Sequence, residues 1–277
     1  MLQQHVIRKL IQLALEEDVS TGDITTTAVL TGEENGKAEA IAKADIIVAG
    51  IDIFREAFLF LDNSIQFKGC CNDGQAVKNG GILAEISGNL GGILTAERVA
   101  LNFFQRMCGI ATLTKRYVDE IKGTRAKILD TRKTAPGLRY LDKYAVVVGG
   151  GTNHRHGLYD GVLIKDNHIA AAGGISNALA RVRGRLPHTL KVEIEVKNLQ
   201  ELDEALASGA DVIMLDNMTV ENMRKAVAIA GGKVPLEASG NVTLENVREI
   251  AETGVDFISV GALTHSVQAS DISLKIE

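Results

Sequence analysis

AKILD (126–130), GVLIK (161–165), KVEIEV (191–196), DVIMLD (211–216), PLEAS (235–239) and DFISV (256–260) are the stretches that decide the fold of this chain. Each is a short apolar run of strand length, and the segments between them have the pattern of amphipathic helices. Strands that alternate with helices predict βα units joined into a parallel sheet.

Polar or glycine residues stand where these strands end. Glu195, Asp216, Ser239 and Gly261 are separated by 21, 23 and 22 positions, a period that fits one strand plus one helix. A parallel sheet with so many crossovers either stays open and doubly wound or closes into a barrel. Polar strand ends favour the barrel, because its site is assembled from the carboxyl ends of several strands. Since only six such strands are visible, we expect the barrel to be incomplete or distorted.

The first third of the chain has a different pattern. KAEAIAKADIIVAG (37–50) and GGILAEISG (80–88) alternate small, apolar and charged residues, and turn signals punctuate them at 72–74 and 79–81. This pattern predicts a small mixed sheet with helices, including one at 52–61. The opening residues 1–18 have the spacing of an amphipathic helix.

Two further segments define the expected domains. The stretch 95–122 reads as mostly helical, with Thr95 as N-cap, Arg98 near an exposed helix end and a break at Gly109. The segment 271–276 alternates like a strand and is expected to return to the first sheet. We therefore predict an N-terminal α/β domain at 1–110, a catalytic barrel domain at 111–266 and a returning segment at 267–277.

Composition restricts the class of protein. The 277 residues are 45% hydrophobic and carry a formal net charge of -5, so no overall positive field attracts nucleic acid or anionic lipid. The apolar runs are far shorter than the roughly 20 residues that cross a bilayer. The start lacks the pattern of a signal peptide. These features predict a cytoplasmic enzyme, and the odd number of cysteines, two of them adjacent, indicates buried reduced thiols at Cys70, Cys71 and Cys108.

The densest chemical signal is ILDTRKTAPGLRYLDKYAVVVGGGTNHRHGLYDGVLIKDNH (128–168). Successive strands are expected to bring five potential cations to one end of the barrel: Arg132, Lys133, His154, Arg155 and Lys165. In an acidic protein such a cluster indicates a polyanion site, and Arg suits bidentate contacts to carboxylate and phosphate. The plain alternative is ordinary exposed basic residues.

Two features of this stretch have more than one interpretation. The triplet at 149–151 either lets backbone N–H groups approach a phosphate or forms a flexible loop. His154, His156 and His168 suit hydrogen bonding to an anion better than metal binding, because the neighbouring cations repel a metal ion.

An acidic half of the site is expected opposite the cations. Glu195 and Asp216 each close an apolar strand, where carboxylates can bind sugar hydroxyls, hold Mg2+ and stabilise positive charge on a sugar carbon. Helix capping or a structural ion pair is the alternative. Two further strand ends are places where barrels commonly bind phosphate: Ser239-Gly240-Asn241 and Ser259-Val260-Gly261.

These motifs resemble one known family. ERVALNFFQRMCGIAT (97–112), DTRKTAPGLR (130–139), GGGTNHRHGLYDGVLIKDNHI (149–169), EIEV (193–196), MLDN (214–217), EASGNV (237–242) and SVGALTHS (259–266) occur in the order found in quinolinate phosphoribosyltransferases. The resemblance extends to EEDVSTGDITT (16–26) and thus over nearly the whole chain.

The resemblance implies a fold with an N-terminal α/β sandwich and an open, distorted α/β barrel. It also implies an activity and a partner. The expected reaction joins quinolinate and phosphoribosyl pyrophosphate, with Mg2+, and yields nicotinate mononucleotide, pyrophosphate and CO2 in NAD biosynthesis. A homodimer or higher homo-oligomer is implied, with Arg98 donated to the neighbouring site.

The resemblance also implies roles for particular residues. Quinolinate would contact Arg132, His154, Arg155 and Lys165, and the donor would lie near Lys133 and Lys165. Thr131 is also expected to bind substrate. Lys133, Lys165, Glu195 and Asp216 are the expected catalytic residues. Of these, Glu195 and Asp216 would meet ribose hydroxyls and the metal ion. The 5-phosphate would lie at Ser239, Gly240, Asn241, Ser259, Val260 and Gly261.

Three other functions compete with this prediction. A barrel transferase for nicotinate or another monocarboxylate base is the nearest, but it would leave an arginine without a partner. An aldolase or lyase would use Lys165 as a Schiff base. A non-catalytic pyridine-nucleotide sensor would have no need of both the acidic and the basic half.

Overall fold

The computed structural model describes residues 3–276, which divide by their contacts into two compact units. The first contains residues up to 115, 135–150 and from 266 on, and the second contains 116–134 and 151–265. The domain boundaries at 110 and 266 stay a prediction. Residues 135–150, which the sequence placed in the catalytic domain, group with the first unit. Hydrogen bonds explain this grouping, because Arg106 donates twice to Asp142 at 2.8 Å and Tyr144 Oη donates to Asp73 at 2.7 Å.

The first unit is built on an antiparallel sheet with the strand order β12-β1-β5-β3. The sheet is therefore antiparallel and not mixed, because its three ladders, β1 with β12, β1 with β5 and β3 with β5, are all antiparallel. Ile272–Ile276 pairs with β1, as the alternation of this segment predicted. The strands are β1 (Asn35–Ala42), β2 (Ile46–Ile47), β3 (Gln66–Gly69), β4 (Ala76–Val77), β5 (Ile82–Asn89) and β12 (Ile272–Ile276).

Helices cover this sheet and provide its core. They are α1 (Gln4–Asp18), α2 (Ile24–Val29), α3 (Ile51–Leu61), α4 (Leu90–Glu120), whose last five residues belong to the second unit, and α5 (Arg139–Val148). The buried face of α1 is the stripe Ile7, Ile11 and Leu15. Phe54 on α3 stacks on Phe104 of α4 with ring centroids 4.7 Å apart. Burial of these aromatic rings fixes α3 against α4.

Helix α4 differs from its prediction. It is one continuous helix from Leu90, so Thr95 is not its N-cap and Gly109 does not break it. Thr95 instead donates to Asp23, the N-cap of α2, at 3.2 Å. A Cβ at Gly109 would collide with the backbone oxygen of Gln268. Gly109 is therefore required for the close approach of the C-terminal segment, and Arg98 lies within the helix, not near an exposed end.

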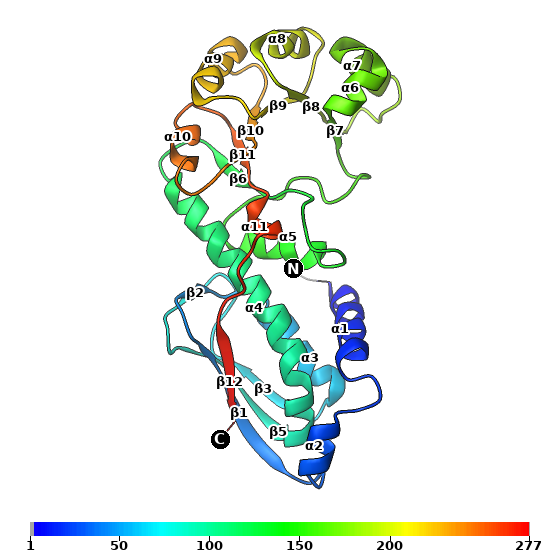
Figure 1. Cartoon of the computed structure of the whole chain (residues 1–277), viewed down its shortest axis with the longest axis vertical. Coiled ribbons are helices and arrows are strands. Elements are labelled where there is room, and N and C mark those ends of the chain that lie inside the picture. The colour runs from blue at the N-terminus through cyan, green and yellow to red at the C-terminus, as the bar shows by residue number, and fades with distance from the viewer. Residues whose placement is uncertain (1–2, 277) are drawn as a thin grey trace. The chain divides into compact units, whose positions relative to one another are not determined.

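The second unit is a parallel sheet with the order β6-β11-β10-β9-β8-β7 (Figure 1). Its strands are β6 (Lys127–Leu129), β7 (Val162–Ile164), β8 (Val192–Val196), β9 (Val212–Asp216), β10 (Leu236–Ser239) and β11 (Phe257–Ser259). All six predicted strands are present, each within a few residues of its expected bounds. Within residues 3–276 no ladder joins β6 to β7, so the barrel is open, as predicted.

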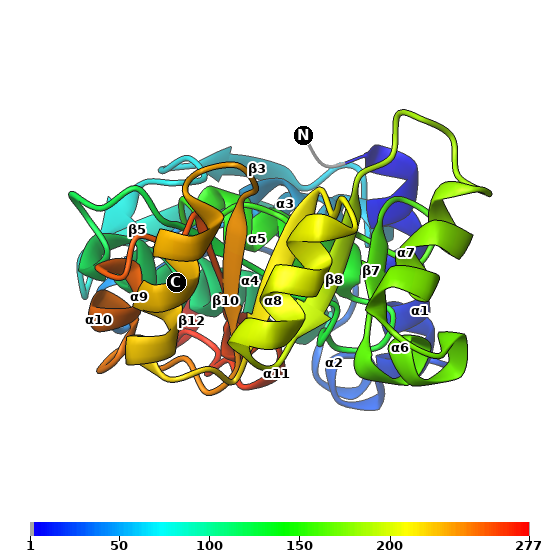
Figure 2. The same cartoon turned by 90° about the horizontal axis from the view of Figure 1, so that it is seen from above.

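Helices lie on the outer side of these strands, which Figure 2 shows from above for α8 and α9. They are α6 (Asp166–Ala172), α7 (Ile175–Arg183), α8 (Leu199–Ala207), α9 (Val220–Ala230) and α10 (Val247–Ala251). The short helix α11 (Ala262–His265) follows β11 at its carboxyl end. Asn198 and Thr219 cap α8 and α9 with their side chains. None of the helices in the described chain is both long and apolar enough to cross a membrane.

The cysteines and the glycine triplet have plain structural explanations. Cys71 and Cys108 are buried as predicted, whereas Cys70 is exposed, and all three are free thiols. Burial raises the pKa of Cys71 to about 11, so it carries no thiolate at neutral pH. A Cβ at Gly149 would lie 2.7 Å from Thr114 Cβ. This first glycine of the triplet therefore permits close packing of the end of α5 on α4.

Candidate active site

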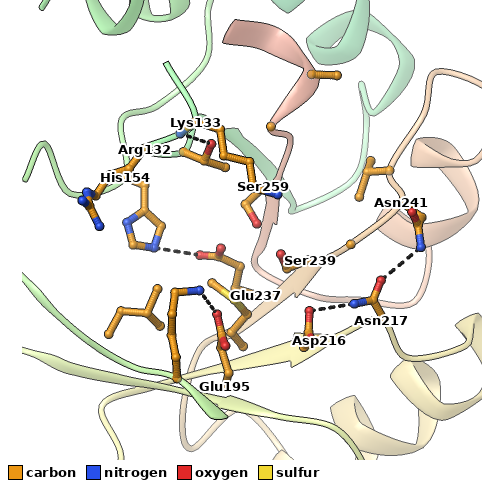
Figure 3. Close-up of a pocket in the computed structure, with 18 of the residues that line it drawn as sticks. Arg132, Lys133, His154, Glu195, Asp216, Asn217, Glu237, Ser239, Asn241 and Ser259 are labelled. Atoms are coloured by element: carbon orange, nitrogen blue, oxygen red, sulfur yellow. Dashed lines mark hydrogen bonds and ion pairs between the residues drawn. The ribbon is translucent and has the colours of Figure 1, made fainter. Parts of the chain in front are cut away.

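A cavity of about 800 Å³ opens within the second unit. Its wall is formed by the carboxyl ends of the parallel strands and the loops that follow them (Figure 3). The predicted site residues that line it are Thr131, Arg132, Lys133, His154, Arg155, Lys165, Glu195, Asp216, Ser239, Gly240, Asn241, Ser259 and Gly261.

Two predicted residues stand apart from this lining. Val260 is only 1% exposed, and its N–H donates to the Leu129 carbonyl at 2.9 Å, so this amide already has a partner. Arg98 is exposed on α4 and belongs to the first unit.

The sheet register explains why distant residues meet at the cavity. Asp216 is paired with Ser239, and Ser239 with Ser259, so the three side chains form a row across β9, β10 and β11. Glu195 and Glu237 are each paired with Met214, which lies two residues before Asp216 on β9. The two glutamates therefore lie at the next level of the sheet below that row. In a parallel sheet such rows place side chains from separate βα units on one wall.

The cationic side of the cavity contains two arginines close together. Burial, followed by the charge of Arg132, lowers the pKa of the Arg155 guanidinium below its ordinary value. Arg155 donates from Nη1 to the carbonyl of Gly161 at 2.9 Å, which fixes its direction. Placing like charges side by side is unfavourable, and an anionic ligand between them would remove the repulsion.

The acidic side is partly neutralised by a cation. Lys165 Nζ is paired with Glu195 Oε1 (Figure 3). The side chain of Glu195 is 12% exposed and that of Lys165 is 47% exposed, so the lysine lies at the open side of the pair. Asp216 accepts a hydrogen bond from Asn217 Nδ2 at 3.0 Å.

His154 is held by hydrogen bonds at both ring nitrogens. Its Nδ1 accepts from the Arg155 N–H at 2.7 Å, so in the neutral ring the proton is on Nε2. Nε2 then donates to Glu193 Oε2 at 2.9 Å. Both contacts are to protein groups, so the role of His154 as a hydrogen-bond donor to a bound anion stays a prediction.

Two buried carboxyls beneath His154 were missed by sequence reasoning. Glu193 is 8% exposed and Glu237 is 1% exposed, and Glu237 Oε2 lies 3.8 Å from His154 Nε2. Burial, together with the charge of Glu193, raises the pKa of Glu237 well above its usual value of 4.5. Glu237 therefore carries a proton at pH values where an exposed carboxyl is ionised. The spacing of the three side chains, within 4.8 Å, would also suit a metal ion.

Two glycines give neighbouring side chains room in the cavity. A Cβ at Gly261 would lie 3.1 Å from Lys133 Cδ and 3.0 Å from His265 Cδ2, and a Cβ at Gly240 would collide with Asn217 Oδ1. His265 and Asn217 also line the cavity and were missed, because neither directly forms a charged strand end.

Comparisons with known proteins agree with this geometry. The family described as "Quinolinate phosphoribosyl transferase, C-terminal domain" matches residues 110–275, and its N-terminal domain matches 23–108. A "Probable nicotinate-nucleotide pyrophosphorylase [carboxylating]" of Bacillus subtilis is 44% identical and matches 98% of this chain and 93% of its own length. A chloroplastic Arabidopsis thaliana relative named nicotinate-nucleotide pyrophosphorylase [carboxylating] is 49% identical, over 98% of this chain and 83% of its own.

A solved structure is also similar over the full length. The nicotinate-nucleotide pyrophosphorylase from Francisella tularensis superposes with a TM-score of 0.96 at 44% identity, covering 100% of this chain and 98% of that one. These family matches span both units and leave the fold, the cavity and the motifs with one common explanation: the chain belongs to the quinolinate phosphoribosyltransferase family.

Proposed function

We propose that this chain transfers the phosphoribosyl group of phosphoribosyl pyrophosphate to quinolinate with loss of CO2, and so forms nicotinate mononucleotide and pyrophosphate. The observation that carries the proposal is the cavity itself. An acidic chain of net charge -5 brings Arg132, Arg155 and Lys165 into one cavity with Glu195 and Asp216, and Lys165 is paired there with Glu195. Relatives that match 98% of this chain are named for this reaction.

The cations bind and orient the two substrates. Arg132 and Arg155 would hold the two carboxylates of quinolinate, since arginine forms bidentate pairs with carboxylate. His154, whose ring nitrogens are hydrogen-bonded to protein groups, would line the pocket beside them. Lys133 and Lys165 would face the anionic donor. The row of Asp216, Ser239 and Ser259 supports placing the ribose hydroxyls and the 5-phosphate along this wall, at Ser239, Gly240, Asn241, Ser259 and Gly261.

The chemistry needs positioning and electrostatics and no covalent intermediate with the protein. The ring nitrogen bonds to the ribose carbon as the bond to pyrophosphate breaks, and that bond's electron pair leaves with pyrophosphate. Glu195 and Asp216 stabilise the positive charge that develops on the sugar. The bond to the adjacent carboxylate then breaks, CO2 leaves, and the electron pair remains on the ring carbon beside the cationic nitrogen until a proton adds.

Glu195 and Asp216 fit a magnesium ion. Both offer carboxylate oxygens on neighbouring strands of one wall, and Mg2+ prefers oxygen ligands. When bound, Mg2+ would neutralise the leaving pyrophosphate, while the two carboxylates keep their contacts to the ribose.

We also propose a cytoplasmic homodimer in which Arg98 reaches the neighbouring site. Its exposure on α4 supports this, because an exposed arginine is accessible to a second copy. Sedimentation analysis of the purified protein and fractionation of cells test the dimer and the location.

The activity is tested with purified protein, quinolinate, phosphoribosyl pyrophosphate and Mg2+. We expect CO2, pyrophosphate and nicotinate mononucleotide in equal amounts. Omission of Mg2+ should greatly lower the rate. Nucleotide formed without CO2, or no turnover by a folded protein, would overturn the proposal.

A further inference from the structure

Two asparagines beside the cavity have an unfavourable backbone conformation. Asn217 follows β9 with φ 53°, and Asn241 lies in the loop after β10 with φ 50°. Left-handed backbone costs free energy for a residue with a Cβ, whereas glycine adopts it freely. Asparagine adopts this conformation more readily than most residues with a Cβ, so the contacts of the two side chains decide whether they have a role.

The two side chains form a directed chain of hydrogen bonds that ends on Asp216. Asn241 Nδ2 donates to Asn217 Oδ1 at 3.1 Å, and Asn217 Nδ2 donates to Asp216 Oδ1 at 3.0 Å (Figure 3). Because Asn217 Oδ1 accepts from Asn241, the amide of Asn217 must present its NH2 group to the carboxylate.

Neighbouring contacts anchor both ends of this chain. Asn246 Nδ2 donates to the Asn241 carbonyl at 2.9 Å, and the Asn217 N–H donates to the Ser239 carbonyl at 2.9 Å. Gly240 has φ 99°, and a side chain there would collide with Asn217 Oδ1. The missing side chain at 240 thus makes room for the Asn217 amide between β9 and the loop after β10.

We propose that Asn217 is a positioning residue that sets the spacing between the Asp216 carboxylate and the 239–241 loop. This inference rests on the proposed function, in which Asp216 meets the ribose hydroxyls and the loop receives the 5-phosphate. One amide then connects the two places that a sugar phosphate must reach together. Loss of the amide should weaken binding of ligands that carry both groups, and leave quinolinate and free phosphate unaffected.

Asn217→Gly tests this, because glycine keeps the backbone conformation without strain and removes only the amide. We expect the KM for phosphoribosyl pyrophosphate to rise about tenfold or more, as for loss of a hydrogen bond to a charged group. The KM for quinolinate and the melting temperature should stay within error of the wild type. Asn198→Ala is the matched control, since Asn198 follows the adjacent β8 and caps α8. It should lower the melting temperature and leave both KM values unchanged.

Calorimetry separates this proposal from the proposed function. Ribose 5-phosphate should bind Asn217→Gly about tenfold more weakly than wild type, whereas inorganic phosphate should bind both equally. A wild type that binds ribose 5-phosphate but does not turn over quinolinate would refute the function alone. Unchanged affinity and KM in a folded Asn217→Gly, equal weakening for phosphate, or loss of cooperative unfolding would each overturn the positioning role.

Discussion

Glu193 and Glu237 are buried carboxyls whose place in the site follows from the alternation of side chains along a strand. Side chains two apart on a strand point to the same face, so Glu193 shares a face with Glu195, and Glu237 shares one with Ser239. The strand ends were recognised in the sequence, but the positions two residues earlier were not. Buried carboxyls are unfavourable without partners, which makes such positions worth testing as part of a site.

Replacement of Glu193 tests its contact with His154. In Glu193→Ala the imidazole Nε2–H loses its acceptor at 2.9 Å, and the ring is free to turn. We expect the KM for quinolinate to rise about tenfold, and Glu193→Gln, which retains an acceptor, to stay near the wild-type value. Steady-state kinetics with matched melting curves measure this. Equal KM values in Glu193→Ala and wild type would show that the contact is not needed.

Removal of the buried acid at Glu237 should change how stability depends on pH. Its raised pKa means that the folded protein holds a proton that the unfolded chain releases above about pH 4.5. Stability therefore falls as the pH rises from there through the folded pKa, because the folded state binds more protons in that window. Glu237→Gln lacks this titration. The melting temperature of the variant minus that of the wild type should therefore increase as the pH rises. Parallel curves between pH 4.5 and 8 would contradict a raised pKa.

At the scale of elements, periodic patterns in the sequence were sufficient to locate the parallel strands. They were not sufficient to predict where α4 begins and that it is continuous. The strands of the second unit are short buried runs between turn signals, and local sequence is enough to locate them. The length of α4 depends on contacts with residues distant in the sequence. Asp23 binds the hydroxyl of Thr95, and the carbonyl of Gln268 needs the space at Gly109. A capping residue and a glycine look the same in sequence whether they end a helix or pack within it.

Gly109→Ala tests the packing explanation. Alanine is the better helix former by about 1 kcal/mol, so local propensity predicts stabilisation. The new Cβ would collide with the Gln268 backbone, and we expect a loss of about 1–3 kcal/mol in the free energy of unfolding. Gly184→Ala is the control, because at φ -69° its Cβ would have only ordinary contacts, the nearest at 3.6 Å. Denaturant titration of both variants measures the difference, and a stabilised Gly109→Ala would show that the C-terminal segment moves aside at little cost.

For the whole molecule, the proposed sharing of Arg98 makes activity depend on assembly. Arg98→Ala and Lys165→Ala should each be nearly inactive alone. Mixed dimers would contain one site that has both wild-type side chains, so mixing followed by subunit exchange should restore up to about a quarter of wild-type activity. Activity assays after exchange check this. A mixture as inactive as its components, with exchange verified by mass spectrometry, would contradict a shared site.

The overall account depends on a net-negative chain holding two polyanions in one basic cavity, and discrimination between bases tests this most directly. Quinolinate has a second carboxylate that nicotinate lacks, so nicotinate would leave buried donors without a partner. The measurement is the ratio of kcat/KM for quinolinate to that for nicotinate, with phosphoribosyl pyrophosphate and Mg2+ in both assays. We predict a ratio of at least about 100, from one or two lost charged hydrogen bonds. A ratio near one would contradict a dicarboxylate site.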